Sequence, residues 1–264
     1  MTPHELLNAG QLTAALDAAT VAVKQHPRDT AQRTFLAELL CFQNEWERAD
    51  KQCESIAQVA PESIVGVSFF RQLIRAEIAR KQFFEEGRMP EFLHEPTPVM
   101  WLHLRASIAL RDNRPAEAAT LLAQADELRV RPQGSCDDQP FQDLRDLDDL
   151  TAPVCEVLTS TGKYYWIGWE QIRQIELESI ERTRDLRWRR ARMVFAGDSD
   201  GEVYLPTLYP LTRTVSDDAL RLGRATDWRA SPGEPVLGLG QRTLLVGQQA
   251  LPILQIKELK FHPI

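Results

Sequence analysis

The first half of the chain carries apolar side chains at helical spacing. One stripe comprises Phe35, Leu36, Leu39, Leu40 and Phe42, and a second comprises Trp46, Ala49, Cys53, Ile56 and Ala57. Residues three, four and seven apart lie on one face of a helix, so each stripe predicts an amphipathic helix with one buried face. Residues 62–84 show the same period and predict a further helix.

Three landmarks recur in this half at a separation of 34 residues. The first copy has Gly10, Ala15 and Pro27, and the second has Asn44, Ala49 and Pro61. Glycine or asparagine can adopt the left-handed conformation that closes a helix, alanine lets two helices approach closely, and proline ends the second helix. A helical unit of this period is typical of a tetratricopeptide repeat. The sequence therefore predicts a tetratricopeptide-like helical array within residues 1–133.

A third, looser copy of the repeat follows, with Asn113, Ala118 and Pro132 at similar spacing. About three stacked repeats are needed for a stable array, because each repeat buries the apolar face of its neighbour. Two good copies leave an apolar end uncovered. We therefore expect the second half of the chain to pack against the array and cover that end.

The hydrophobic pattern changes after residues 134–140, whose composition predicts a loop. Short β-rich runs then lie between turn residues, at 164–167, 172–177, 192–195, 203–205, 236–239, 243–246 and 253–256. Runs this short predict a small antiparallel barrel or a curled sheet. Two short helices are expected as well, at 152–159 and 216–222. The predicted fold class is α+β, multidomain, with a helical domain at 1–133 and a β-rich domain at 140–264.

Charge and hydropathy narrow the classes of function. The chain has a net charge of −7, and neither half is basic, which argues against non-specific binding to nucleic acid. No apolar run approaches the roughly 18 residues that a membrane-spanning helix needs. The N-terminus lacks the pattern of a secretory signal, and the four cysteines show no CxxC spacing. These features predict a cytoplasmic protein with reduced, buried cysteines that contacts neither membranes nor nucleic acid.

The motifs of catalysis and cofactor binding do not occur in the sequence. The five histidines lack HExxH or other zinc spacing, and no Gly-x-Ser-x-Gly elbow or GxxxxGK[ST] phosphate loop is present. Residues 238–242 begin like a dinucleotide fingerprint, but the third glycine and the following helix are missing, so we interpret them as a tight bend between strands. We therefore predict no catalytic residue, metal or cofactor.

Two charged clusters keep other functions open. The acidic residues Asp143, Asp146, Asp148 and Asp149 could hold a divalent cation in a metal-dependent enzyme of unknown reaction. A basic cluster could bind nucleic acid in a regulator, by charge and by stacking on Trp188; it comprises Arg182, Arg184, Arg187, Arg189, Arg190 and Arg192. Structural interpretations compete with both. The acids would also suit a solvated loop or a helix N-terminus, and the arginines would suit ion pairs with nearby Glu176, Glu178, Glu181 and Asp185.

Several short motifs occur in an order that resembles one known family. They are Leu39-Leu40-Cys41, Gln43-x-x-Trp46-Glu47-Arg48-Ala49, Arg75-Ala76-Glu77, Tyr164-Tyr165-Trp166, Leu186-x-Trp188, Leu208-Tyr209-Pro210, Asp217-Asp218-Ala219-Leu220-Arg221-Leu222 and Gly238-Leu239-Gly240-Gln241-Arg242. From about residue 5 to residue 260, the chain resembles the ImpE family, also called TagJ or SciE, of bacterial type VI secretion accessory proteins.

The resemblance implies a non-enzymatic, cytoplasmic adaptor of a type VI secretion system. Such proteins bind the small sheath subunit and connect with ClpV, the AAA+ ATPase that recycles contracted sheaths. A curved array of helices suits an amphipathic helix from such a partner. Polar residues within the apolar helices, Arg33, Glu38 and Gln72, are our candidates for partner contacts at the lip of this groove.

Overall fold

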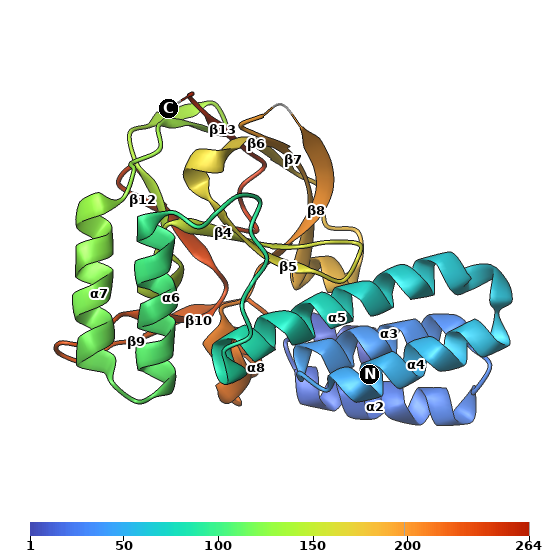
Figure 1. The fold of residues 1–264 in the computed structure, drawn as a ribbon. Helices are drawn as coiled ribbons and strands as arrows, with labels where there is room; N and C mark the ends of the chain where they lie inside the picture. The colour runs from blue at the N-terminus through green and yellow to red at the C-terminus, as the bar shows by residue number, and fades with distance from the viewer. Residues whose placement is uncertain (198, 264) are drawn as a thin grey trace.

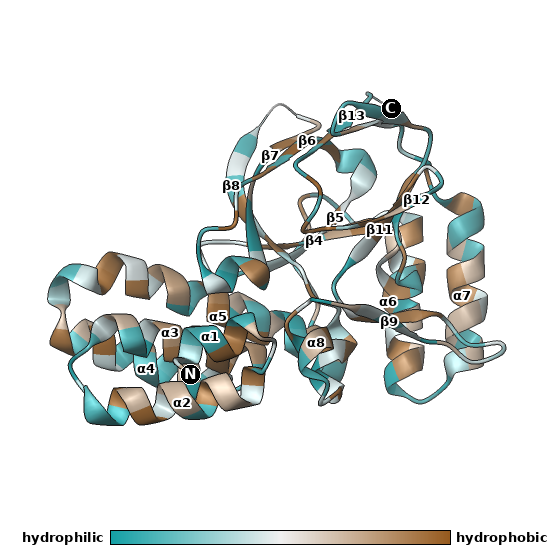
Figure 2. Cartoon of the chain, turned by 180° about the vertical axis from the view of Figure 1, so that it is seen from behind, coloured by the Kyte–Doolittle hydropathy of each residue, from teal (hydrophilic) through white to brown (hydrophobic). Residues whose placement is uncertain are grey.

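A computed structural model describes residues 1–197 and 199–263. Its N-terminal part is an array of antiparallel helices, α1 Pro3–Asn8, α2 Leu12–Gln25, α3 Thr30–Phe42, α4 Trp46–Val59 and the long α5 Ile64–Glu86. Figure 1 shows these helices stacked side by side, with α5 running along the boundary with the β-rich part. Figure 2 shows them banded in teal and brown, as expected of amphipathic helices. None of the described helices is both long and apolar enough to cross a membrane.

The repeat landmarks do what their residue types predict. Gly10 and Asn44 have φ values of 82° and 61°, in the left-handed region, directly after α1 and α3. Ala15 and Ala49 are both 0% exposed. Pro27 lies beyond the end of α2 and Pro61 beyond the end of α4. The predicted register of the first two repeats is therefore confirmed.

The third copy forms a separate helical hairpin, α6 Pro98–Arg111 and α7 Pro115–Leu128. Its turn residue Asn113 is left-handed, with φ 56°, and Ala118 is 0% exposed, as the repeat pattern predicts. The hairpin does not continue the stack, however. Its buried face packs against Leu150 and Leu237 of the β-rich part, and Figure 1 shows it on the side of that part away from α2–α4.

The largest sheet of the described residues is antiparallel, with strand order β2-β1-β13-β6-β7-β8-β4-β5. The strands are β1 Gly134–Cys136, β2 Gln139–Phe141, β4 Val154–Leu158, β5 Tyr164–Gly168, β6 Ile172–Leu177, β7 Trp188–Phe195, β8 Asp200–Pro206 and β13 Glu258–Phe261. The two outermost strands, β2 and β5, do not pair with each other within the described chain. Of the two predicted architectures, the barrel is therefore wrong and the curled sheet is confirmed.

Two smaller antiparallel sheets complete the β-rich part. One has the order β12-β11-β3, from β12 Gln249–Pro252, β11 Thr243–Val246 and β3 Leu144–Asp146; the other pairs β9 Thr226–Arg229 with β10 Leu237–Gly240. Gly240, with φ 81°, makes the predicted bend between β10 and β11. The predicted helix at 216–222 exists as α8 Asp218–Arg221, and its cap is Asp217.

Two local predictions were wrong. Within residues 152–159 the chain forms the strand β4 rather than a helix, because this stretch is buried between β8 and β5 and tertiary pairing overrides its weak helical pattern. Residues 134–140 are a β-hairpin rather than a loop. Its turn residues Asp137 and Asp138 both have positive φ, and the Asp137 carboxylate accepts hydrogen bonds from the Lys257 and Glu258 amides.

The helical array and the sheet share one core. Buried apolar residues of α2–α5 are contiguous with Trp166, Trp188, Tyr204 and Leu208 of the β-rich part. A second core lies within the sheets, around Ile175 of β6. The expected packing of the second half against the array is thus confirmed, while the division into domains at 1–133 and 140–264 stays a prediction.

Candidate functional site at the junction of array and sheet

One segment of the β-rich part fills the inner face of the array. It consists of the 3-10 turn η4 Thr183–Leu186, Arg187 and the first residue of β7, and we call it the η4 segment, residues 183–188. Trp188 is 1% exposed and lies against Trp46 of α4 and Phe70 of α5, with ring centroids 6.3 and 6.2 Å apart. The face of the array that would hold a partner peptide in a typical repeat protein is therefore occupied by the chain itself.

Two arginines of the η4 segment lie over aromatic rings of the array. The Arg184 guanidinium is 5.0 Å from the ring centre of Phe70, and the Arg187 guanidinium is 4.7 Å from that of Trp46. Such cation–π contacts strengthen when they are shielded from water, and both arginines are buried. The segment is thus held by aromatic packing and charge together.

A buried carboxylate on α5 connects these groups. Glu77 accepts hydrogen bonds from Arg80 Nη1 at 3.0 Å, Arg187 Nη2 at 3.3 Å and Trp188 Nε1 at 2.9 Å. Its side chain is 6% exposed. Burial alone would raise the pKa of Glu77, but the guanidiniums of Arg80 and Arg187 outweigh that effect and hold the pKa below its ordinary value of 4.5. Glu77 is therefore ionised at neutral pH.

The network continues from α5 into the sheet. Arg80 Nε and Nη2 bind both oxygens of Glu156 on β4, at 2.8 and 2.9 Å. Glu156 also bonds Arg242, which in turn bonds Asp146. Burial acts to raise the pKa of Glu156, but Arg80 and Arg242 lower it to about 2. This chain of ion pairs, which we call the junction network, ties α5 to three separate strands or loops of the β-rich part.

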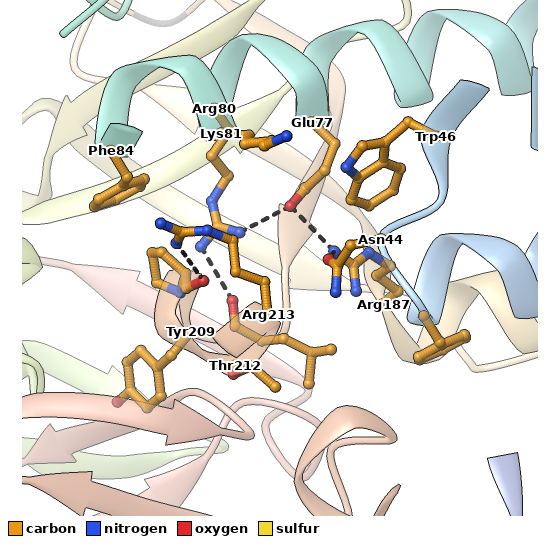
Figure 3. A pocket seen from close by; sticks show the side chains of 13 residues that line it. Asn44, Trp46, Glu77, Arg80, Lys81, Phe84, Arg187, Tyr209, Thr212 and Arg213 are labelled. Carbon is orange, nitrogen blue, oxygen red and sulfur yellow. Dashed lines mark hydrogen bonds and ion pairs between the residues drawn. The ribbon is translucent and has the colours of Figure 1, made fainter. Parts of the chain in front are cut away.

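Beside the junction network lies a small pocket between α5 and the 3-10 turn η5 Pro210–Thr214 (Figure 3). Its volume is about 20 Å³, room for little more than one water-sized group. The lining includes Trp46, Glu77, Lys81, Arg187 and Arg213. We call this the junction pocket. Its size excludes a nucleotide or a similar organic cofactor.

A larger, more open groove runs along the first half of α5. Two adjoining hollows of about 350 and 330 Å³ share Gly66, Arg182 and Arg184 in their lining. The walls are Val65 and Phe69 of α5, residues within 178–185 and, on the array side, Thr30, Ala31 and Thr34 of α3. We call this the α5 groove. It takes its walls from both halves of the chain.

The three residues predicted to contact a partner do not meet in one place. Arg33 donates to the carbonyl of Pro27 and to Gln52 Oε1, at 2.9 and 2.8 Å, and is half-buried. Gln72 is also half-buried and lies beside Gly162, between β4 and β5.

Glu38 lies elsewhere, beneath the α5 groove. It is 5% exposed and faces Arg184 at 3.9 Å, so its expected position at the lip of a groove is wrong. The pKa of Glu38 is raised to about 7 because burial outweighs the attraction of Arg184.

The acidic cluster is satisfied by protein donors. Asp143 pairs with Arg129 through both oxygens at 2.8 Å, and Asp146 pairs with Arg242. Asp148 accepts from the Leu150 and Gly238 amides, and Asp149 from the Val236 amide. In the described part of the chain, no group of three or more potential ligand residues is arranged to hold a metal ion. The carboxylates of this cluster therefore have a structural role that requires no metal ion.

The basic cluster is likewise engaged in structural contacts. Arg184, Arg187 and Arg189 are buried, and Arg189 donates to the carbonyls of Glu178 and Leu254. The ion pairs expected with Glu176, Glu178, Glu181 and Asp185 do not form among the described residues. Four of the arginines pair with other carboxylates instead, the buried Arg184 with Glu38 and Arg187 with Glu77, and the exposed Arg190 with Glu202 and Arg192 with Asp200. A continuous basic surface for nucleic acid does not result.

Sequence reasoning missed the junction network itself. The signal was present: Glu77 continues the apolar spacing of Val67, Phe70 and Ile74 on α5, and Arg80 follows one turn later. Charged residues at apolar positions of an amphipathic helix indicate buried pairing. Their partners Glu156 and Arg187 lie far along the chain, and only the fold brings them together.

Comparisons with known proteins point to one family, from the β-rich part alone in one case and over nearly the whole chain in two others. The sequence model of the ImpE family, described as "ImpE protein", matches residues 138–260. The type VI secretion system accessory component TagJ of Pseudomonas aeruginosa is 30% identical over 263 residues, which cover 100% of this chain and 92% of TagJ. The crystal structure of protein VPA1032 from Vibrio parahaemolyticus superposes with a TM-score of 0.92 at 30% identity, covering 98% of this chain and 97% of that one.

Proposed function

This chain belongs to the ImpE family, and from that membership we propose that it is a non-enzymatic adaptor of a type VI secretion system. In this proposal it works in the cytoplasm, binds the small sheath subunit and assists recruitment of the sheath-recycling AAA+ ATPase ClpV. The observation that carries the proposal is the similarity to TagJ, a named accessory component of such a system, over the whole chain.

The α5 groove is the surface we assign to the sheath subunit. The inner face of the array is filled by the η4 segment, so an arriving helix needs another site. In the groove, Val65 is 79% exposed and neighbouring Ile64 is 54% exposed. A side chain built on Gly66 would meet no atom within 4 Å, so a partner helix can approach the backbone of α5 closely. Exposed apolar residues rimmed by charges suit the apolar face of an amphipathic helix.

The three residues predicted from the sequence to contact a partner have different roles in this proposal. Glu38 would act indirectly, by fixing Arg184 in the wall of the α5 groove. Arg33 and Gln72 lie away from the groove and are proposed only as secondary contacts. Alanine substitutions at Arg33 and Gln72 would therefore weaken partner binding less than changes in the groove.

The test uses the full chain and the purified small sheath subunit. Fragments are unsuitable, since a helical fragment would expose residues such as Trp46 and Phe70, which are buried against Trp188. Val65→Asp places a charge in the groove and should weaken binding about tenfold or more, because an anchor in a buried contact is worth about 1–2 kcal/mol. The matched control is Val21→Asp, an exposed valine of α2 at 52%. Both variants should keep the stability of the parent protein.

If both valine variants bind the sheath subunit equally well, the sheath site does not lie in the α5 groove. No binding of the sheath subunit by the parent protein would refute the adaptor proposal in this form. The recruitment step is tested by asking whether ClpV is retained on immobilised protein, with and without the sheath subunit. A pull-down from the native cytoplasm, analysed by mass spectrometry, tests the partners independently.

A further inference from the structure

The two hollows of the α5 groove differ in charge. The first, of about 350 Å³, is lined by the carboxylates of Glu178, Glu181, Asp185 and Glu202 and by the guanidiniums of Arg182, Arg184 and Arg190. The second, of about 330 Å³, shares Arg182 and Arg184 with the first, and no carboxylate of the described residues lines it. Four negative and three positive groups thus line the first hollow, whereas two positive groups alone line the second.

The chain itself does not fully neutralise the two arginines of the second hollow. Arg182 is exposed, and its guanidinium forms no ion pair with a carboxylate of the described residues; the nearby Asp185 carboxylate accepts instead from the backbone amides of Glu181 and Arg182, at 3.0 and 2.8 Å. Arg184 is 8% exposed and pairs only with Glu38, at 3.9 Å. Burial raises the pKa of Glu38 to about 7, so this partner is only partly ionised at neutral pH.

The remaining lining of the second hollow also suits a negatively charged side chain. Thr30 and Ala31 belong to the first turn of α3, where a helix carries a positive partial charge. Their neighbour Asp29 caps the helix through the Gln32 amide, at 3.0 Å, and does not line the hollow. Apolar side chains complete the lining, among them Val67 and Phe70 of α5. An acidic side chain would therefore find cations for its carboxylate and apolar surface for its stem.

The first hollow, by contrast, would repel an acidic side chain. Glu178 and Glu181 are exposed, and their carboxylates form no ion pair among the described residues. Glu202 pairs with Arg190, which leaves no guanidinium free to answer them at that end. Like charges placed against a partner disfavour the wrong arrangement as effectively as opposite charges favour the right one. The charge pattern thus restricts where along the groove a negative group can lie.

We propose that the helix bound in the α5 groove presents an aspartate or glutamate to the second hollow, where Arg182 and Arg184 bind its carboxylate. Arginine binds carboxylates through charge-assisted hydrogen bonds, often two at once. Val65 and Phe69 contact the apolar face of the same helix. This inference rests on the adaptor function and adds the chemistry of the partner, an amphipathic helix whose apolar residues adjoin a carboxylate.

The first arm of the test measures binding of the small sheath subunit to the full chain. Arg182→Glu reverses an exposed charge in the groove and should weaken binding about tenfold or more, as expected for the loss of one hydrogen bond to a charged group. The matched control is Arg105→Glu, an equal change at an exposed arginine of α6 that likewise forms no ion pair among the described residues. This control should bind like the parent, and both variants should keep its unfolding midpoint.

The second arm uses two synthetic amphipathic peptides as probes. They share one leucine face, and the positions that flank it carry glutamate in one peptide and lysine in the other. The chain has a net charge of −7, so without a specific site it would attract the lysine peptide more strongly. The parent and Arg105→Glu should instead bind the glutamate peptide about tenfold more tightly than the lysine peptide. Arg182→Glu should lose this preference.

The two arms separate this inference from the adaptor function. The inference is wrong if the parent does not prefer the glutamate peptide, or if the preference survives in Arg182→Glu. It is also wrong if the parent and Arg182→Glu bind the sheath subunit equally well. Failure of the parent to bind the sheath subunit counts against the adaptor function, while the peptide pair still decides the chemistry of the groove.

Discussion

Removing the carboxylate of Glu77 should destabilise the junction more than any exposed ion pair could. Glu77 is the common acceptor for Arg80, Arg187 and Trp188, and its side chain is 6% exposed. Glu77→Ala leaves two guanidiniums and one indole nitrogen in a space that water hardly reaches. Breaking a buried ion pair in this way costs about 3–5 kcal/mol. For a chain of this size that corresponds to a fall in the unfolding midpoint on the order of 10 °C.

A matched substitution distinguishes the effect of removing a buried carboxylate from that of removing an exposed one. Glu202 pairs with Arg190 on the surface, where both side chains are about half exposed. Exposed pairs contribute about 0–1 kcal/mol, so Glu202→Ala should shift the midpoint by only a degree or two. Thermal unfolding followed by circular dichroism measures both variants, and urea unfolding provides the free energies.

The pH dependence supplies a second criterion for Glu77. Its pKa is lower in the folded chain than the ordinary 4.5, so the ionised carboxylate stabilises the fold above that value. This contribution is lost as the pH falls through the folded-state pKa. The stability difference between the parent and Glu77→Gln should therefore be constant above about pH 6 and shrink as the pH falls below 4.5. A Glu77 variant that resembles Glu202→Ala, or a difference that does not change with pH, would refute this account.

Three further results are expected. Ala49→Leu should destabilise the array by about 1–3 kcal/mol in urea unfolding, because Ala49 is fully buried where α3 and α4 pack together. Gly134→Ala should weaken the pairing of β1 with β13, since a β-carbon there would lie 1.8 Å from the Lys260 carbonyl oxygen. Gly66→Ala, in open space on α5, should instead stabilise the protein by about 0.5–1 kcal/mol. Burial lowers the pKa of His103 to about 4, so stability should fall as the pH drops from 6.5 to 4, and a His103→Gln variant should lose less over that interval in parallel titrations.

The helical half was predictable because its signals are local. A left-handed residue, a small residue at a helix crossing and a terminating proline each act within one repeat, and all three occur at the expected positions in both copies. The third copy shows the limit of this reasoning. Asn113 and Ala118 specify the hairpin α6–α7, but nothing in their spacing specifies which surface it packs against.

The β-rich half was less predictable because its pairing is non-local. Strand β1, from the middle of the chain, pairs with β13 near the C-terminus, and β4 lies between β5 and β8. The stretch around β4 includes Glu156, whose burial makes sense only with Arg80 and Arg242 in place. A charged residue in an otherwise apolar run can be read as one face of a helix. Here Glu156 lies in a buried strand between β8 and β5, and its counter-ions Arg80 and Arg242 come from other parts of the chain.

The same non-local contacts explain why Glu38 does not lie at the lip of a groove. Glu38 was chosen because a polar residue within an apolar helix suggests the edge of a groove. The structure places Arg184 of the η4 segment directly against it, so the polar position serves an intramolecular contact. Partner residues of repeat proteins are predictable from sequence only when the inner face of the array is free.

Because the η4 segment fills the inner face of the array, that face joins the two halves of the chain. The η4 segment and the junction network hold α5 against the sheet through Trp188, Glu77 and Arg80, so the two halves are joined by a buried, charged interface. The α5 groove takes one wall from the array and the other from residues 178–185 beside the sheet. Either half of the chain alone would present only one wall of the α5 groove. Recognition in this groove would therefore be a property of the joined chain, and a loosened junction would weaken partner binding even where no contact residue has changed.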